Sequence, residues 1–225
     1  MFIARYMTTP PFTIAPEMTI PAARELLQSR HFRHLPVVDE GGKLIGMLTD
    51  RDLRSAYPSS VLSGEVIKSC LAELDKTPVS AIMSRAFFTV TPDSTLDDAL
   101  ILLDRERVGA LPVLDEAGTV VGIFSIRDLI KAYRSLFGLG ERGSAMIVVA
   151  DDGNPKPLTR ISRVLEEHQI RFTRLIRKEK ENPQDNATIY LRVNTYNLSA
   201  VRSALHEAGF QVAIPTIIPP TEQPA

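Results

Sequence analysis

Tryptophan is absent from this 225-residue sequence, aromatic residues make up only 6% of it, and cysteine occurs once, as Cys70. A single cysteine cannot close an internal disulfide or supply the thiolate cluster of a structural zinc site. No apolar run approaches the ~18 residues that a membrane-spanning helix needs. Residues 1–7 are neither basic nor followed by the apolar core of a signal peptide, so a cytoplasmic location is expected.

A large excess of either charge is also missing. Lys and Arg together number 26 against 27 Asp and Glu, which gives a formal net charge of −1. A protein that holds DNA or RNA through its phosphates normally carries a clear basic excess, so nucleic-acid binding is not expected. With 44% hydrophobic and 24% charged residues, the composition is that of a folded globular protein.

What the sequence does contain is an internal duplication. A shift of 76 residues aligns residues 7–57 with residues 83–133 without a gap, and 20 of the 51 pairs are identical. Chance would give only a few identities, so the two segments are copies of one unit. The identical pairs include Phe12/Phe88, Pro16/Pro92, Thr19/Thr95, Pro36/Pro112, Asp39/Asp115, Gly46/Gly122 and Asp52/Asp128.

Each copy has the same order of predicted elements, β-α-β-β-α. A short β-prone piece precedes an N-capping threonine and a helix with apolar residues at helical spacing. An apolar run then predicts a buried strand, an Asp-Glu-x-Gly turn predicts a hairpin, and a second strand leads into a short helix. These features are Phe12–Ile14, Thr19, Leu35–Val38, Lys43–Leu48 and the helix after Thr49 in the first copy, and Phe88–Val90, Thr95, Leu111–Leu114, Thr119–Phe124 and the helix after Ser125 in the second.

The C-terminal third contains no third copy. Its elements are predicted in the order β-α-β-β-α-β, which is that of the ferredoxin-like sandwich. They are Ala145–Ala150, Pro157–His168, Ile170–Arg177, Thr188–Val193, Leu198–Ala208 and Val212–Ile218.

The predicted fold class is therefore α+β, with three small units in one chain. A unit of ~50 residues buries little surface alone, so the two copies are expected to share one core. The predicted organisation is a first unit (1–57), a linker with a helix over Ser63–Leu74 (58–76), a second unit (77–136), a glycine-rich joint (137–143), a C-terminal domain (144–218) and a tail (219–225).

The end of each hairpin carries a motif with two possible uses. Gly46-Met-Leu-Thr49-Asp-Arg-Asp52 recurs as Gly122-Ile-Phe-Ser125-Ile-Arg-Asp128. A hydroxyl and free N–H groups at a helix N-terminus suit a phosphate, and an aspartate can accept two hydrogen bonds from a ribose diol. The same spacing of a hydroxyl and an acid three residues later is also a capping box, which needs no ligand.

The paired units, their Leu-Pro-Val strands and their Gly-x-x-Thr/Ser-x-x-Asp ends together resemble a tandem CBS-domain pair, a Bateman module, over residues 1–135. The resemblance implies a cleft between the copies that binds AMP, ADP, ATP or S-adenosylmethionine. It implies that Asp52 with Thr49, and Asp128 with Ser125, hold the ribose or phosphate. No catalytic cofactor is implied, and the chain contains no nucleophile elbow, Walker loop or dinucleotide-binding glycine motif.

The copies differ just before the Leu-Pro strand. Arg33 and His34 stand where basic residues reach phosphates in nucleotide-binding CBS pairs, whereas Val108, Gly109 and Ala110 resemble the small apolar rim that takes adenine. The better site is therefore expected to combine Thr49, Asp52, Arg33 and His34 with Val108–Ala110. A second site with Ser125, Asp128 and the bulky Phe32 is expected to be weaker or empty, and surface charge is the alternative role of Arg33 and His34. No metal site is expected, because His31 and His34 need not share a face.

The C-terminal domain is similar to an ACT domain, a small-ligand-sensing ferredoxin-like fold. Pro155, Leu158 and Ile161 keep the frame of the amino-acid-binding motif of that family, but Lys156 replaces the glycine that lets a ligand approach the backbone. Dimerisation is therefore a competing role for this domain.

The order CBS–CBS–ACT resembles the acetoin-utilisation regulatory (AcuB-like) proteins of bacteria. It implies a non-catalytic, ligand-sensing homodimer that relays nucleotide binding to the ACT-like domain or to a target enzyme. Two alternatives stay open, an interaction scaffold with vestigial sites and a regulatory subunit of a separately encoded enzyme.

Overall fold

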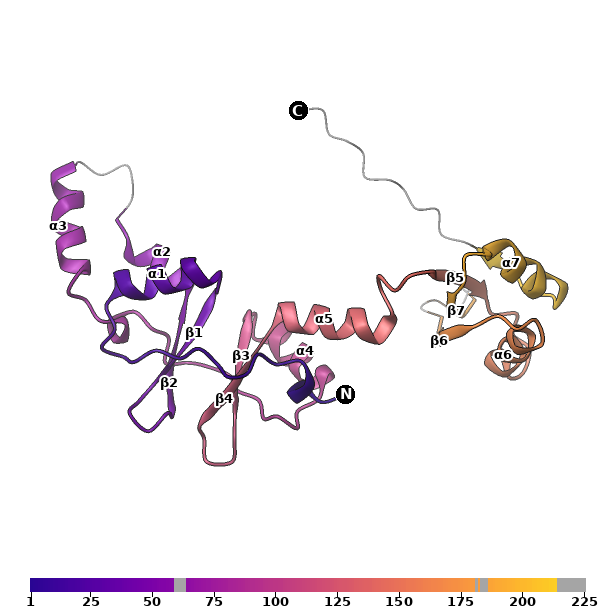
Figure 1. Cartoon of the computed structure of the whole chain (residues 1–225), viewed down its shortest axis with the longest axis horizontal. Helices are drawn as coiled ribbons and strands as arrows, with labels where there is room; N and C mark the ends of the chain where they lie inside the picture. The colour runs from indigo at the N-terminus through magenta and orange to yellow at the C-terminus, as the bar shows by residue number, and fades with distance from the viewer. Residues whose placement is uncertain (59–63, 181, 183–185, 214–225) are drawn as a thin grey trace. The chain divides into compact units, whose positions relative to one another are not determined.

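The computed structural model describes residues 1–58, 64–180, 182 and 186–213. The described residues form two compact units, of which the first ends at Ala132 and the second begins at Tyr133. Each unit is described by itself below, and Figure 1 shows the order of the elements along the chain. Among the described residues, no helix is long and apolar enough to cross a membrane.

Two antiparallel hairpins form the framework of the first unit. Strands β1 (His34–Val38) and β2 (Leu44–Thr49) form the first hairpin, and β3 (Ala110–Leu114) and β4 (Val120–Ser125) form the second. Both hairpins have the same register and an irregularity at the same place, as expected for duplicated segments. The apolar runs that predicted buried strands are indeed buried at their centres.

Helices and short 3-10 turns surround these hairpins. Buried apolar residues such as Ile20, Leu27, Leu35, Leu48 and Leu53 form a core in the first copy. The elements are η1 (Ile3–Arg5), α1 (Ile20–Arg30), α2 (Asp50–Ala56), α3 (Gly64–Leu74), η2 (Val79–Ala81), α4 (Leu96–Arg105) and α5 (Ile126–Phe137). The predicted linker helix is α3; its predicted first residue, Ser63, lies outside the described residues.

The two copies exchange their leading segments. Thr8 forms an antiparallel bridge with Ile123 of β4, in the second copy. Reciprocally, Ser84 forms an antiparallel bridge with Met47 of β2, in the first copy, through two backbone hydrogen bonds of 2.9 Å. Each copy therefore supplies backbone partners to the other, which explains why both belong to one compact unit.

The predicted β-prone pieces form single bridges rather than strands. Ile14 bridges Val37 in a parallel sense, and Val90 bridges Val113 in the same way. The prolines that follow at positions 16 and 92 cannot donate a ladder hydrogen bond, which limits how far such a strand can extend.

The second unit contains a four-stranded antiparallel sheet. Its strands are β5 (Ser144–Ala150), β6 (Phe172–Lys178), β7 (Thr188–Asn194) and β8 (Val212–Ala213), in the order β6-β7-β5-β8. Helices α6 (Pro157–Glu167) and α7 (Leu198–Glu207) share one apolar core with alternate residues of β5 and β7. The elements follow in the order β-α-β-β-α-β, and the part of the last predicted strand beyond Ala213 lies outside the described residues.

Candidate functional site

A pocket of about 420 Å³ lies between the two copies in the first unit. Its walls come from the segment that joins α1 to β1 in the first copy and from both strands of the second hairpin. A volume of this size is typical of small-molecule sites. The exchanged leading segment contributes Thr8 and Phe12, so the pocket depends on the pairing of the copies.

Basic side chains outnumber acidic ones at this pocket. Arg30, His31, Arg33 and His34 all lie on its wall, and Arg127 joins them from the first turn of α5. Among the described residues that line the pocket, Asp128 is the one acid. This balance favours an anionic ligand that also offers hydrogen-bond donors to a carboxylate.

Aromatic rings form an apolar part of the wall. The rings of Phe12 and Phe32 are tilted against each other with centroids 5.5 Å apart. The guanidinium of Arg30 lies 4.9 Å from the centroid of Phe12, a cation–π distance that holds its charge at the pocket. Together with Ile123 and Ile126, these rings supply a surface on which a flat base can stack.

The side chain of His34, in the first copy, contacts Gly109 of the second copy. A Cβ atom added at Gly109 would lie 2.7 Å from both Cε1 and Nε2 of His34, so the imidazole rests against the glycine backbone. Burial lowers the pKa of His34 below its ordinary value of 6.5, and the charge of Arg33 lowers it further. Asp52 and Asp50 oppose this shift to a smaller extent. The neutral imidazole is therefore favoured near neutral pH.

Both hydroxyl–aspartate motifs form capping boxes. In the first copy Asp52 Oδ2 accepts hydrogen bonds from the Thr49 amide (2.8 Å) and the Thr49 hydroxyl (2.6 Å). In the second copy Asp128 Oδ2 accepts from the Ser125 amide (2.9 Å) and the Ser125 hydroxyl (2.7 Å). The caps engage Oδ2 of each carboxylate, so capping and ligand binding through Oδ1 are compatible.

The structure groups the predicted site residues differently from the expected better site. Arg33, His34, Gly109 and Ala110 line the pocket together with Ser125 and Asp128. Thr49, Asp52 and Val108 are not among the lining residues of this pocket. Thr49 lies beside His34 in the hairpin register, and the His34 ring contacts Gly109 of the second copy.

The pocket-lining residues that sequence reasoning did not select include Arg30, Arg127 and Phe12. A signal for Arg30 exists in the duplication, because residues 30–34 read Arg-His-Phe-Arg-His where residues 106–110 read Glu-Arg-Val-Gly-Ala. The basic character of the first copy therefore begins two residues before Phe32. Phe12 gave no such signal, because its place at the pocket follows from its tertiary contacts with Phe32 and Arg30.

A second hollow of about 540 Å³ lies over α1 and α2, where the Arg24 guanidinium stands 4.1 Å from the Tyr57 ring centroid. None of the predicted nucleotide-binding residues lines it. Within the described ranges, no three His, Cys, Asp or Glu side chains are grouped so that they could hold a metal ion.

Known proteins match the duplicated part of the chain. The family model of the CBS domain matches residues 3–59 and 79–135, and its match ends before the C-terminal domain. A CBS domain-containing protein of Dictyostelium discoideum is 35% identical over 130 residues, which are 58% of this chain and 89% of that protein.

Solved structures show the same likeness. The CBS domain pair of protein MJ0100, in complex with 5′-methylthioadenosine and S-adenosyl-L-methionine, is 27% identical, with a TM-score of 0.50. The match covers 60% of this chain and 98% of that chain. A structure described as that of an acetoin utilization protein (AcuB) from Vibrio cholerae is 26% identical, with a TM-score of 0.53, over 63% of this chain and 96% of that one.

Proposed function

Because this chain belongs to the CBS domain family, we propose that it is a non-catalytic regulatory protein that binds one adenosine nucleotide in the pocket between its two copies. The observation that carries the proposal is the meeting of Asp128, the cationic segment 30–34 and an apolar wall around one cavity. The adenosine ligands of the MJ0100 pair support the choice of ligand class.

In this proposal Asp128 accepts hydrogen bonds from the ribose diol, and the Ser125 hydroxyl lies beside it. Arg33 and His34 face the phosphates, whereas Phe32, Gly109 and Ala110 border the base. Thr49, Asp52 and Val108 would belong to a second, weaker site, the reverse of the ranking expected from sequence.

The charge of the pocket favours AMP, ADP or ATP over S-adenosylmethionine. Three arginines line the cavity against one aspartate. Phosphate groups complement this excess, whereas the sulfonium and ammonium groups of S-adenosylmethionine add positive charge to it. We therefore expect the nucleotides to bind more tightly than S-adenosylmethionine.

Isothermal titration calorimetry on the full chain tests this site. AMP, ADP, ATP and S-adenosylmethionine are titrated into the wild type, Asp128→Ala and Asp52→Ala. Each substitution removes the carboxylate of an equivalent helix cap, so Asp52→Ala controls for the loss of the cap at Asp128. Asp128→Ala is expected to weaken binding by about tenfold or more, the usual effect of losing hydrogen bonds to a charged group, and Asp52→Ala to leave it nearly unchanged.

The opposite result would favour the grouping around Asp52 that the sequence suggested. Equal affinity in the wild type and both variants would show that neither aspartate binds the nucleotide. Binding of none of the four compounds would favour the alternative function, an interaction scaffold with vestigial sites.

The finer parts of the proposal concern the rest of the molecule. We propose that the C-terminal domain is an ACT-like domain, that it or a target enzyme receives the nucleotide signal, and that the chain works as a cytoplasmic homodimer. The order of its elements and strands supports the ACT-like assignment. Light scattering tests the homodimer, and a particle of 24.9 kDa, the mass of one chain, would contradict it.

A role in acetoin utilisation is supported by the likeness to the Vibrio cholerae structure. The other alternative, a regulatory subunit of a separately encoded enzyme, predicts that an enzyme co-purifies with the full chain. Mass spectrometry of affinity-purified native complexes would distinguish it from a protein that acts alone.

A further inference from the structure

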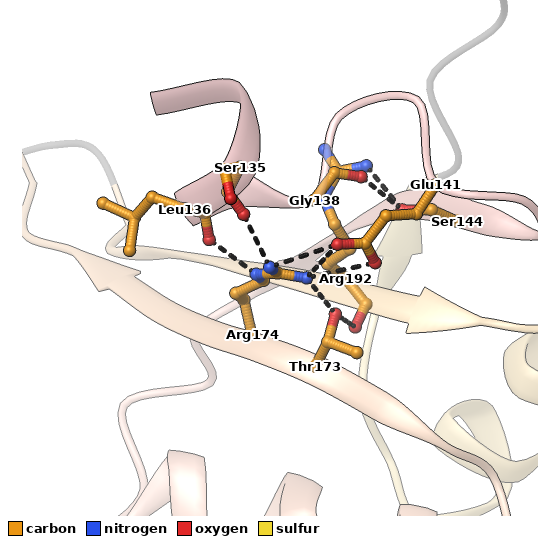
Figure 2. A network of polar contacts seen from close by, with 8 residues as sticks. All are labelled: Ser135, Leu136, Gly138, Glu141, Ser144, Thr173, Arg174 and Arg192. Atoms are coloured by element: carbon orange, nitrogen blue, oxygen red, sulfur yellow. Dashed lines mark hydrogen bonds and ion pairs between the residues drawn. The ribbon is translucent and has the colours of Figure 1, made fainter. Parts of the chain in front are cut away.

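Two arginines stand side by side on the sheet of the second unit. Arg174 of β6 pairs directly with Arg192 of β7, so both side chains lie on the same face of the sheet. That face is opposite the helices, because the neighbouring residues Leu191 and Val193 point into the core that α6 and α7 cover. Like charges in directly opposite positions repel, and Figure 2 shows what surrounds them.

Arg174 is well provided with acceptors. Its Nε donates to the Leu136 carbonyl (2.6 Å) and its Nη2 to the Ser135 carbonyl (2.9 Å), both in the last turn of α5 (Figure 2). These carbonyls carry the partial negative charge of a helix C-terminus. The carboxylate of Glu141 also faces Arg174, but its contacts are 3.4–3.5 Å long.

Arg192 has fewer hydrogen-bond acceptors than Arg174 among the described residues. Arg192 is only 6% exposed. Among the described residues, its guanidinium makes one hydrogen bond, from Nη1 to the Ser144 hydroxyl (3.0 Å). Its buried Nε has no hydrogen-bond partner among the described residues. Burial and the charge of Arg174 lower the pKa of Arg192, and Glu141 opposes this only partly. Among the described residues this buried cation has no direct counter-ion, which is costly, so the site favours the binding of an additional acceptor.

We propose that the Arg174–Arg192 pair is a binding site for the oxyanion group, carboxylate or phosphate, of a small molecule. A guanidinium presents two parallel donors that fit such a group, and two adjacent guanidiniums suit one anion. The site lies within the second unit and shares no residue with the nucleotide pocket.

Glu141 lies at the solvent-exposed side of the arginine pair. Its side chain is 45% exposed and that of Arg174 is 24% exposed, so the pair is open on this side. Because the contacts of Glu141 with Arg174 are long, a ligand oxyanion can take the place of this carboxylate. The incoming anion then completes the charge balance of both arginines.

NMR titration of the full chain with inorganic phosphate, and separately with malonate, tests the proposal at constant ionic strength. Saturable shifts of the Ser144 and Arg192 amide resonances are expected, with a dissociation constant of about 1 mM or below for at least one anion. Because the resonances are read one by one, phosphate bound at the nucleotide pocket cannot be mistaken for this site.

Variants separate binding from folding. Arg192→Met is expected to weaken binding by about tenfold or more, whereas the exposed Arg202→Met serves as a charge-matched control. Glu141→Gln removes the competing carboxylate and is expected to tighten binding, which a purely structural role of the pair would not produce. The proposal is overturned by the absence of saturable shifts with both anions, or by equal binding to the wild type, Arg192→Met and Glu141→Gln.

Discussion

At the scale of single residues, the contact between Gly109 and His34 is the most sensitive point of the nucleotide pocket. A methyl group at position 109 would lie 2.7 Å from two atoms of the imidazole, which must then move. We predict that Gly109→Ala destabilises the first unit by about 1–3 kcal/mol, the usual cost of overpacking, and weakens nucleotide binding. Urea unfolding and calorimetry measure the two effects.

Gly41→Ala is the matched control for this substitution. Gly41 lies in the exposed turn of the first hairpin, where an added Cβ would approach only Asp39 Oδ1, at 3.3 Å. Its substitution is expected to change stability by less than that of Gly109. Equal effects of the two substitutions would mean that the His34 contact has no special weight.

His34 also predicts a pH dependence of stability. Its pKa in the folded chain lies below the ordinary 6.5, chiefly because of burial and then because of Arg33, so the unfolded chain takes up a proton first. The free energy of unfolding should therefore fall as the pH drops from 6.5 toward the folded pKa. Urea unfolding of the wild type and His34→Gln across this window measures it, and identical pH profiles would contradict the assignment.

The residues that line the pocket could be predicted better than which of them lie together in one site. The sequence pointed to Arg33, His34, Gly109, Ser125 and Asp128, all of which line the pocket. Which aspartate shares a pocket with the basic segment depends on how the two copies pack against each other, including the contact of His34 with Gly109. No local sequence pattern contains that packing.

At the scale of elements, the duplication allows the N-caps of α1 and α4, two equivalent helices, to be compared. Thr95 begins α4 with a capping box, in which its hydroxyl accepts from the Asp98 amide and the Asp98 carboxylate accepts from Thr95. The hydrogen bond from the Thr95 hydroxyl lowers the pKa of Asp98. Thr19 occupies the same position before α1, but its side chain makes no cap hydrogen bond.

We predict that Thr95→Ala costs about 1 kcal/mol of stability, as loss of an N-cap usually does, and that Thr19→Ala costs clearly less. The physical reason is the residue three positions later, which is Asp98 in one copy and Ala22 in the other. Chemical unfolding of both variants gives the comparison. An equal loss for the two threonines would show that the capping box adds nothing at α4.

Hairpins and helices were the elements that the sequence predicted most closely. The Asp39 carboxylate accepts from the Gly41 and Lys43 amides, so the turn chemistry is local and readable from sequence. The pieces at Phe12–Ile14 and Phe88–Val90 were less predictable, because their partners are distant residues of β1 and β3. Thr19 occupies the expected N-cap position before α1, but its side chain makes no cap hydrogen bond.

At the scale of the whole molecule, the exchange of leading segments joins the two copies in one compact unit. Met47 and Ile123 each receive a backbone partner from the other copy. A ligand between the copies is therefore expected to stabilise the whole first unit, by about 2.7 kcal/mol at a concentration of 100 times its dissociation constant.

The proposed relay makes a stricter demand, because a ligand shifts a conformational equilibrium only through different affinities for the two states. With saturating ATP, hydrogen exchange is expected to slow in β3 and β4, and also to change in residues 137–143 and β5 of the second unit. Asp128→Ala should abolish both effects, measured by mass spectrometry. Protection confined to the first unit would contradict the relay but leave the nucleotide site intact, and the signal would then pass to a partner protein from the first unit itself.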